Sequence, residues 1–293
     1  MTREEELLIE LGRRALKSGA AMPRANRSET LEEGLRREKA AAGIIKRAAD
    51  SSASGSGGSS RVSGEVGFIL HSRSWSETSL LLDVLTPVHG RLFMAAKGAR
   101  RGTSPMRGLL QPFQPLRLSW NGRGEVKNLT GAEWLGTLAP ANGEALLSAY
   151  YLNELVMKTT QREDVHPELF GLYVESLKEL SSGSKEERQK TLRRFETRLL
   201  RILGWELTAK FSPEDRGFIL IDGVLVGVSR GPYPGEAYYD KQAVAAVIRE
   251  DFSKPQTMRQ ARDILRSAIE THLGARGMST RAVMSDLAKF LSE

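Results

Sequence analysis

Four cations lie close together in a glycine-rich stretch of eleven residues, from residue 97 to residue 107. They are Lys97, Arg100, Arg101 and Arg107. Gly98, Gly102 and Gly108 lie between or beside them and leave the backbone free to follow a ligand. Lys and Arg displace the counterions condensed on a nucleic acid, whatever its base sequence, so this stretch predicts phosphate binding. A solvated surface loop is the alternative interpretation.

Further cations and aromatic rings surround this stretch. Arg91 precedes it, and Arg123 and Lys127 follow it. Trp75 lies in the polar run SRSWSE and is the ring that we expect at the surface, where a base can stack on it. We expect most other rings of the region to lie in the core. The candidate nucleic-acid contacts are therefore Arg91, Lys97, Arg100, Arg101, Arg107, Arg123, Lys127 and Trp75.

The sequence has no cysteine-based metal site and no phosphate-binding or zinc-protease motif. There is no cysteine, and the four histidines are too scattered to form a metal site. No phosphate-binding P-loop or HExxH pattern occurs, and the run from Gly122 to Gly124 is too short for a dinucleotide fingerprint. We therefore expect a binding protein without a cofactor, and not an enzyme.

Composition limits the kind of partner and the compartment. A formal net charge of +7 and a pI near 9.7 favour a polyanionic partner. No apolar run reaches the roughly 18 residues that a membrane helix needs. The first residues carry charges where a secretory signal has its apolar centre. We expect a soluble cytoplasmic protein, and 293 residues are enough for two domains.

Five short apolar runs must position the cations. They are Val66–Leu70, Ser79–Leu85, Leu92–Ala96, Gln114–Trp120 and Val126–Leu129, with turn residues between them. Asn121 to Gly124 predicts a hairpin loop, because Asn and Gly accept positive φ angles. Five strands of this spacing fit the five-stranded Greek-key barrel known as the OB-fold, although a β-meander gives nearly the same pattern.

Helical periodicity dominates the rest of the chain. Helices are predicted over 144–160, 167–180, 185–203, 257–273 and 280–291. The pattern breaks over 211–235, where residues 219–228 alternate around Asp222 and Gly223 and predict a hairpin. The predicted fold class is α+β, in which an N-terminal five-stranded OB-fold barrel precedes a helical domain with a small β insert.

The first 61 residues have a different character. Residues 4–17 and 28–49 are candidate surface helices, and the run from Ser51 to Ser60 is a flexible Ser/Gly linker by composition. Few large apolar residues occur before the linker, so we expect a flexible extension. The predicted domains are residues 1–61 as this extension, 62–137 as the OB-fold, and 138–293 as the helical domain.

Several motifs in order resemble those of one known family. They are HSRSWSETSLLLDVLT from His71, GR at Gly90, AKGAR from Ala96, QPF from Gln111 and GRGEVK from Gly122. Together they closely resemble the RecO family of bacterial recombination mediators, and the resemblance extends to about Arg281. Several members hold zinc on four cysteines in the region of the predicted β insert, and this chain has none.

The resemblance implies a function and partners. It implies binding of single- and double-stranded DNA, annealing of complementary strands, and help to RecR in loading RecA onto strands coated by single-strand-binding protein. Arg276 and Arg281, in HLGARGMSTR, are candidates for the acidic tail of that protein, or else cap helix ends. Two alternatives stay open, which are an RNA-binding OB-fold protein and a scaffold for acidic peptides. The implied location is the cytoplasm, at the nucleoid.

Overall fold

The computed structural model describes residues 61–136, 138, 143–273 and 278–280. The helices predicted over 4–17 and 28–49 lie outside these residues, as does nearly all of the one predicted over 280–291. The chain falls into two compact units. The first unit comprises the residues up to Ser181 together with those from Ser279 onward, and the second runs from Ser182 to Met278. The domain boundaries stay a prediction.

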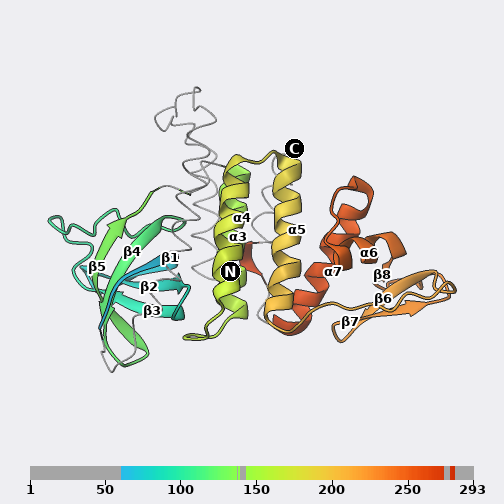
Figure 1. Ribbon diagram of the computed structural model, residues 1–293, viewed down its shortest axis with the longest axis horizontal. Helices are drawn as coiled ribbons and strands as arrows, with labels where there is room; N and C mark the ends of the chain where they lie inside the picture. The colour runs from blue at the N-terminus through green and yellow to red at the C-terminus, as the bar shows by residue number, and fades with distance from the viewer. Residues whose placement is uncertain (1–60, 137, 139–142, 274–277, 281–293) are drawn as a thin grey trace. The chain divides into compact units, whose positions relative to one another are not determined.

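A closed five-stranded barrel forms the start of the first unit (Figure 1). Its strands are β1 (Arg61–Trp75), β2 (Ser79–Thr86), β3 (Gly90–Ala96), β4 (Pro115–Asn121) and β5 (Val126–Trp134). They are joined in the order β1-β2-β3-β5-β4. All pairs are antiparallel except β3 with β5. The predicted OB-fold is confirmed, and each predicted strand lies within or overlaps an observed one.

Strand β1 has 15 residues, three times the five predicted, because it pairs with two neighbouring strands. Its first half pairs with β4, from Arg61 to Phe68, and its second half pairs with β2, from Phe68 to Trp75. The register shifts once in each half, between Val62 and Glu65 and between Ile69 and His71. Such bulges bend and twist a strand, which lets a single strand close the barrel.

The barrel core follows the alternation of strands. Inward side chains of every strand form one apolar cluster, together with two residues of the β3–β4 connection. The buried members are Ile69, Leu82, Val84, Leu92, Met94, Ala96, Ala99, Leu110, Leu116, Leu118, Trp120 and Leu129. Burial of these side chains removes apolar surface from water and stabilises the barrel.

Two helices pack on the outer side of β1 (Figure 1). They are α3 (Gly143–Thr159) and α4 (Pro167–Ser182), and both were predicted. The Phe68 ring lies 5.8 Å from that of Phe170 and 5.4 Å from that of Tyr173. Asn153 donates a hydrogen bond of 2.7 Å to the Leu70 carbonyl and accepts one of 2.6 Å from the Tyr173 hydroxyl. Apolar packing and a buried polar chain thus fix both helices on the barrel.

The segment after α3 returns to the barrel at the start of β3. The backbone N–H of Glu163 donates to the Arg91 carbonyl over 2.8 Å. Gly90 has a φ of 66°, and a side chain there would overlap the Asp164 carbonyl. Only glycine accepts both the positive φ and the close backbone, so Gly90 lets residues 160–164 cover the edge of β3.

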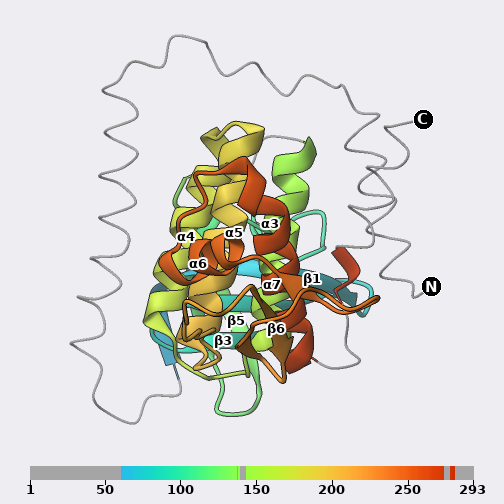
Figure 2. The same ribbon diagram turned by 90° about the vertical axis from the view of Figure 1, so that its right-hand side faces the viewer.

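The second unit contains α5 (Lys185–Ile202), β6 (Gly217–Ile221), β7 (Val224–Val228), β8 (Tyr238–Tyr239), α6 (Lys241–Arg249) and α7 (Pro255–Leu273). The predicted hairpin is confirmed, with Asp222 and Gly223 at positive φ in its turn. Helix α6 and strand β8 were not predicted. Helices α6 and α7 pack side by side (Figure 2). The α+β fold class is therefore confirmed, and among the described helices none has the length and apolarity to span a bilayer.

Candidate nucleic-acid interface

The tip of the β1–β2 hairpin and the cationic loop after β3 are held together. The backbone N–H of Arg100 donates to the Thr78 carbonyl over 2.8 Å. The N–H of Gly98 donates to the Ser79 hydroxyl over 3.4 Å. The Arg100 guanidinium also reaches the Ser76 carbonyl at 3.5 Å. Trp75 lies at the base of that tip, so these contacts hold it beside the loop. The residue is exposed, at 47%.

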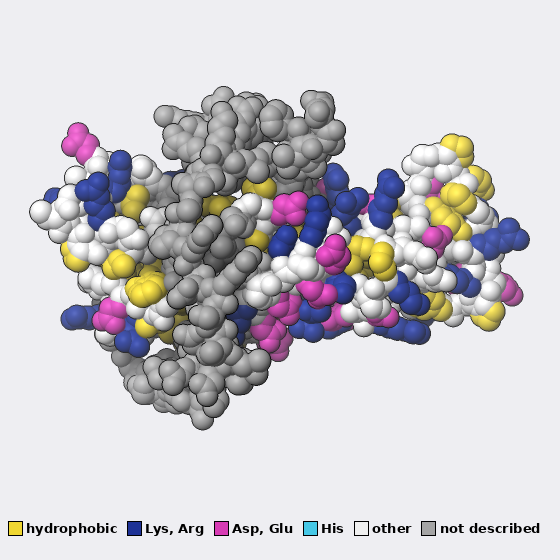
Figure 3. Space-filling view, turned by 90° about the horizontal axis from the view of Figure 1, so that it is seen from above, with side chains coloured by type: hydrophobic (Ala, Val, Ile, Leu, Met, Phe, Trp, Pro, Cys, Tyr) yellow, Lys and Arg dark blue, Asp and Glu magenta, His cyan; other side chains and the backbone are white. Residues whose placement is uncertain are grey.

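Buried residues anchor the loop at both ends while its cations stay outside. Ala99 and Leu110 belong to the barrel core. A succession of turns joins them, with N–H to carbonyl bonds from Arg101 to Gly98 and from Ser104 to Arg101. Lys97, Arg100, Arg101 and Arg107 are all exposed. We call these four cations and Trp75 the cationic platform. Figure 3 shows Lys and Arg side chains on the visible face of the barrel, at the left of the view.

Three cations of the cationic platform have no competing partner in the described part of the chain. Lys97, Arg101 and Arg107 make no side-chain hydrogen bond or ion pair there. A guanidinium or ammonium in this state binds a phosphate without first losing an internal contact. The arrangement therefore suits a flexible polyanion that lies across the loop.

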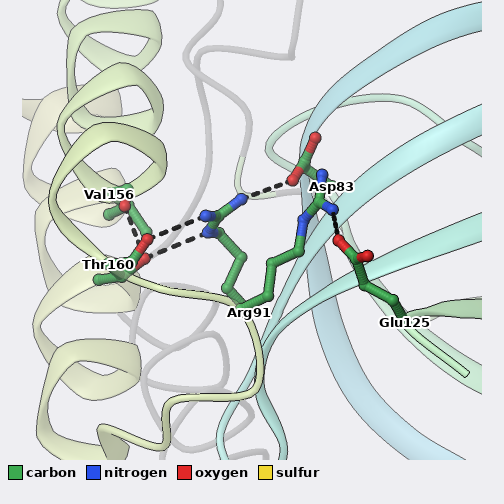
Figure 4. A network of polar contacts seen from close by, with 6 residues as sticks. Asp83, Arg91, Glu125, Val156 and Thr160 are labelled. Atoms are coloured by element: carbon green, nitrogen blue, oxygen red, sulfur yellow. Dashed lines mark hydrogen bonds and ion pairs between the residues drawn. The ribbon is translucent and has the colours of Figure 1, made fainter.

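Arg91 has a different environment from the one expected for a DNA contact. It is nearly buried, and its guanidinium donates to Asp83 over 2.7 Å and to the Thr160 carbonyl and hydroxyl over 2.9 and 3.3 Å (Figure 4). The Thr160 hydroxyl in turn donates to the Val156 carbonyl over 2.7 Å. Arg91 thus joins β2 and β3 to the end of α3.

Lys127 also has partners, whereas Arg123 has none among the described residues. The Lys127 ammonium donates to the Gly124 carbonyl over 2.9 Å and pairs with Glu163 at 2.8 Å. Arg123 is exposed in the connection between β4 and β5, apart in sequence from the cationic platform. The candidate residues therefore divide into six exposed side chains and two that hold the barrel and its neighbouring segment together.

A carboxylate inside this region shifts the titration of a histidine. Glu65 is 6% exposed and accepts hydrogen bonds from the Val88 N–H over 3.2 Å and from His89 Nδ1 over 2.6 Å. The hydrogen bond to Glu65 raises the pKa of His89 above its usual value, against the opposing effect of burial. The pair links the β2–β3 turn to β1.

Sequence reasoning missed a second cluster on the outer face of the barrel. The Phe93 ring on β3 has the Arg162 guanidinium 4.1 Å from its centroid and the Arg73 guanidinium at 5.2 Å. Arg162 also pairs with Glu125 of the β4–β5 connection. Arg73 lies on β1 but beyond the strand predicted over Val66–Leu70, and no sequence pattern signals that Arg162, from beyond α3, lies on this face.

The last two groups of predicted residues concern an acidic-peptide site and a metal site. Arg276 and Arg281 lie outside the described residues. Over 61–136, 138, 143–273 and 278–280, no three His, Asp or Glu side chains gather as metal ligands would. The cationic platform and the Phe93 cluster are thus the features that bear on a nucleic-acid interface.

Comparisons with known proteins agree on one family. The family model for the N terminal of recombination protein O matches residues 64–138, and the one for its C terminal matches residues 140–212. A DNA repair protein RecO of Ralstonia nicotianae is 43% identical over 237 residues, which cover 78% of this chain and 86% of that protein. The protein of the same name from Burkholderia pseudomallei is 39% identical, with 78% and 84% covered. That from Aromatoleum aromaticum is 36% identical, with 78% and 97% covered.

Proposed function

The chain belongs to the RecO family of DNA repair proteins, and on that premise we propose that it binds single- and double-stranded DNA through its barrel and anneals complementary strands. The observation that carries the proposal is the cationic platform, where Trp75 and four exposed cations lie together and three of the cations have no side-chain partner among the described residues. Such cations bind phosphates of any sequence, and an exposed ring stacks on unpaired bases.

Annealing follows from the same electrostatics. Two complementary strands repel each other through their phosphates until pairing begins. A protein that neutralises both backbones at one surface lowers this repulsion and raises the local concentration of each strand. The reaction makes and breaks no covalent bond, so the proposed role is that of a binding protein and not of an enzyme.

The candidate residues have different roles in DNA binding. Lys97, Arg100, Arg101, Arg107 and Arg123 contact phosphates, and Trp75 contacts a base. Arg91 and Lys127 act indirectly, because their charged ends already hold Asp83, Thr160 and Glu163. They position the barrel against the segment that follows α3.

Partners complete the proposal. The protein acts in the cytoplasm at the nucleoid, where with RecR it helps to load RecA onto strands coated by single-strand-binding protein. The acidic tail of the latter protein contacts Arg276 and Arg281. Family membership supports this part, and no described residue carries it.

Fluorescence anisotropy with a labelled single-stranded oligonucleotide, measured across a salt series, tests DNA binding by the platform. We expect the Lys97/Arg100/Arg101→Glu variant to lose most affinity. Three lost phosphate contacts also lower the slope of log affinity against log salt by about 2. The control is Arg259/Arg262/Arg266→Glu, which makes the same charge change on three exposed residues of α7. Equal losses in both variants, or none in the platform variant, would contradict the proposal.

A strand-annealing assay tests the second half of the proposal. Two complementary oligonucleotides with a donor and an acceptor dye report pairing as energy transfer. The wild-type chain and the α7 control should accelerate pairing, and the platform variant should not. If the wild-type chain binds DNA but leaves the annealing rate unchanged, binding stands and annealing fails.

A further inference from the structure

Phe93 presents its ring on the outer face of the barrel. It pairs across the sheet with Asp83 of β2 and Val126 of β5. Its inward neighbours along β3, Leu92 and Met94, belong to the core, so Phe93 points the other way. Phe93 is only 7% exposed as a residue, and the guanidinium groups of Arg73 and Arg162 lie near the face of its ring. An aromatic face is thus present on the barrel surface but covered.

The cover is held by a contact that solvent and solutes can reach. Arg162 pairs with Glu125, and the side chains are 34% and 69% exposed. Exposed ion pairs are weak, because water and salt screen them. The side chain of Arg91, two residues before Phe93 on β3, is instead 12% exposed and bonds to Asp83 and Thr160. Arg162 is therefore the exchangeable arginine of the two, and a phosphate can take the place of Glu125.

We propose that Arg73, Phe93 and Arg162 form a subsite for one unpaired nucleotide of single-stranded DNA. On binding, Arg162 moves from Glu125 to a phosphate, a base takes its place on the Phe93 ring, and Arg73 neutralises the adjoining phosphate. The inference rests on the proposed DNA-binding function and adds to it a named base contact outside the cationic platform.

Stacking makes this subsite selective for single strands. A base in a duplex has both faces covered by its neighbours, whereas an unpaired base offers a face to an aromatic ring. Phosphate contacts alone do not distinguish the two forms. Phe93 therefore adds affinity for single strands only, as Trp75 does, while the four cations of the cationic platform bind both forms.

The first test separates stacking from folding. Phe93→Leu removes the ring and keeps an apolar side chain. Its affinity is compared with wild type on oligothymidine and on an abasic oligonucleotide of the same length. We expect about a fivefold or greater loss on oligothymidine, as for one lost base stack, and less than about twofold on the abasic backbone. A misfolded variant would lose affinity for both oligonucleotides equally. An equal loss of affinity for the two, or no loss for either, overturns the subsite.

The second test uses the carboxylate that holds Arg162. Glu125→Gln releases the guanidinium, so oligothymidine should bind about two to three times more tightly. Glu133→Gln is the matched control, because Glu133 is similarly exposed and pairs with Arg117 at 3.1 Å elsewhere on the barrel. If the two substitutions change the affinity for oligothymidine equally, the cause is the general change of charge, and the subsite is overturned. If wild type binds no DNA at all, the proposed function itself fails.

Discussion

An arginine whose guanidinium is already hydrogen-bonded must lose those bonds before it can bind a phosphate. Arg91 and Arg101 have the same side chain and lie ten residues apart. Arg91 bonds to Asp83 and Thr160, while Arg101 is exposed without a partner in the described residues. Arg91 should therefore contribute to folding stability, and Arg101 should contribute to DNA affinity.

Substitution of Arg91 tests this division. Arg91→Ala leaves Asp83 and the Thr160 carbonyl without their donor, so we expect a loss of about 2–3 kcal/mol in the free energy of unfolding. Arg101→Ala should change stability by less than about 0.5 kcal/mol. Urea denaturation followed by circular dichroism measures both. Unchanged stability with weakened DNA binding in Arg91→Ala would restore Arg91 as a direct contact.

A buried carboxylate provides a pH-dependent contact. Glu154 of α3 accepts hydrogen bonds from the N–H groups of Ser279 and Thr280 over 2.7 and 2.8 Å and pairs with Lys158 at 2.7 Å. Burial alone would raise the pKa of Glu154, but the hydrogen bonds from Lys158, Thr280 and Ser279 outweigh it and lower that pKa from its ordinary 4.5. The charged form is thus favoured by folding, so its stabilisation is present above pH 4.5 and disappears as pH falls through the lower folded pKa.

Glu154→Gln should therefore be less stable than wild type at pH 7, by about 1–3 kcal/mol. The difference should narrow below pH 4.5, as wild type loses its charged hydrogen bonds. Urea denaturation at a series of pH values measures this gap in the free energy of unfolding between the variant and wild type. Glu77→Gln, at an exposed residue, is the control and should show no gap. A gap in Glu154→Gln that stays constant down to pH 3 would refute the assignment.

The exposed positions of most candidate contact residues were predictable at this scale, and the unpredicted burial of two of them has a physical cause. The loop from Lys97 to Arg107 is cationic and glycine-rich in sequence, and its exposure follows from composition. The burial of Arg91 and Lys127 could not be predicted, because their partners Thr160 and Glu163 come from beyond the barrel. Position along the chain carries no information on which distant segment covers a strand.

Among the elements, the contact between the start of β3 and residues 160–164 depends on a missing side chain. Gly90→Ala would place a methyl group on the Asp164 carbonyl at a φ of 66°. We expect a loss of about 2–3 kcal/mol in the free energy of unfolding, from strain and overlap together. Gly108→Ala is the control, because Gly108 also has a positive φ but open space around it, and it should cost about 1 kcal/mol. Similar losses in both variants would show that φ alone matters.

The elements themselves were mostly readable from periodicity. Helices α3, α4, α5 and α7 begin and end within about two residues of their predicted bounds. Strand β1 was underestimated, since its bulges and the polar residues 71–75 interrupt the apolar pattern. Helix α6 was missed because it is nine residues long and follows a stretch rich in glycine and proline.

At the scale of the whole molecule, the larger share of the net positive charge lies after the extension. Residues 1–60 carry eleven Lys and Arg against nine Asp and Glu, so most of the net charge of +7 lies in the rest of the chain. The family models also begin after this segment, at residue 64. The family match supports the proposal that DNA binding belongs to the chain from residue 61 onward.

Deletion of residues 1–60 should therefore leave the affinity for single-stranded DNA within about twofold of wild type, with the same salt dependence. Anisotropy titrations of the two chains at matched ionic strength check this. The platform substitutions in the shortened chain serve as the control and should abolish its binding. A large loss on deletion alone would move a DNA contact into the extension.

The two-sided pairing of β1 also has a consequence for synthesis on the ribosome. The first half of β1 pairs with β4, some 55 positions along the chain from Gly64 to Ser119, while β2 follows at once. At about 5–20 residues per second, the stretch from Trp75 to the end of β5 takes roughly 3–12 seconds to translate. During that delay the nascent β1–β2–β3 sheet exposes an open edge at Val66 and Phe68. Such an edge pairs readily with other chains, so slow translation between residues 97 and 134 should favour aggregation over barrel closure.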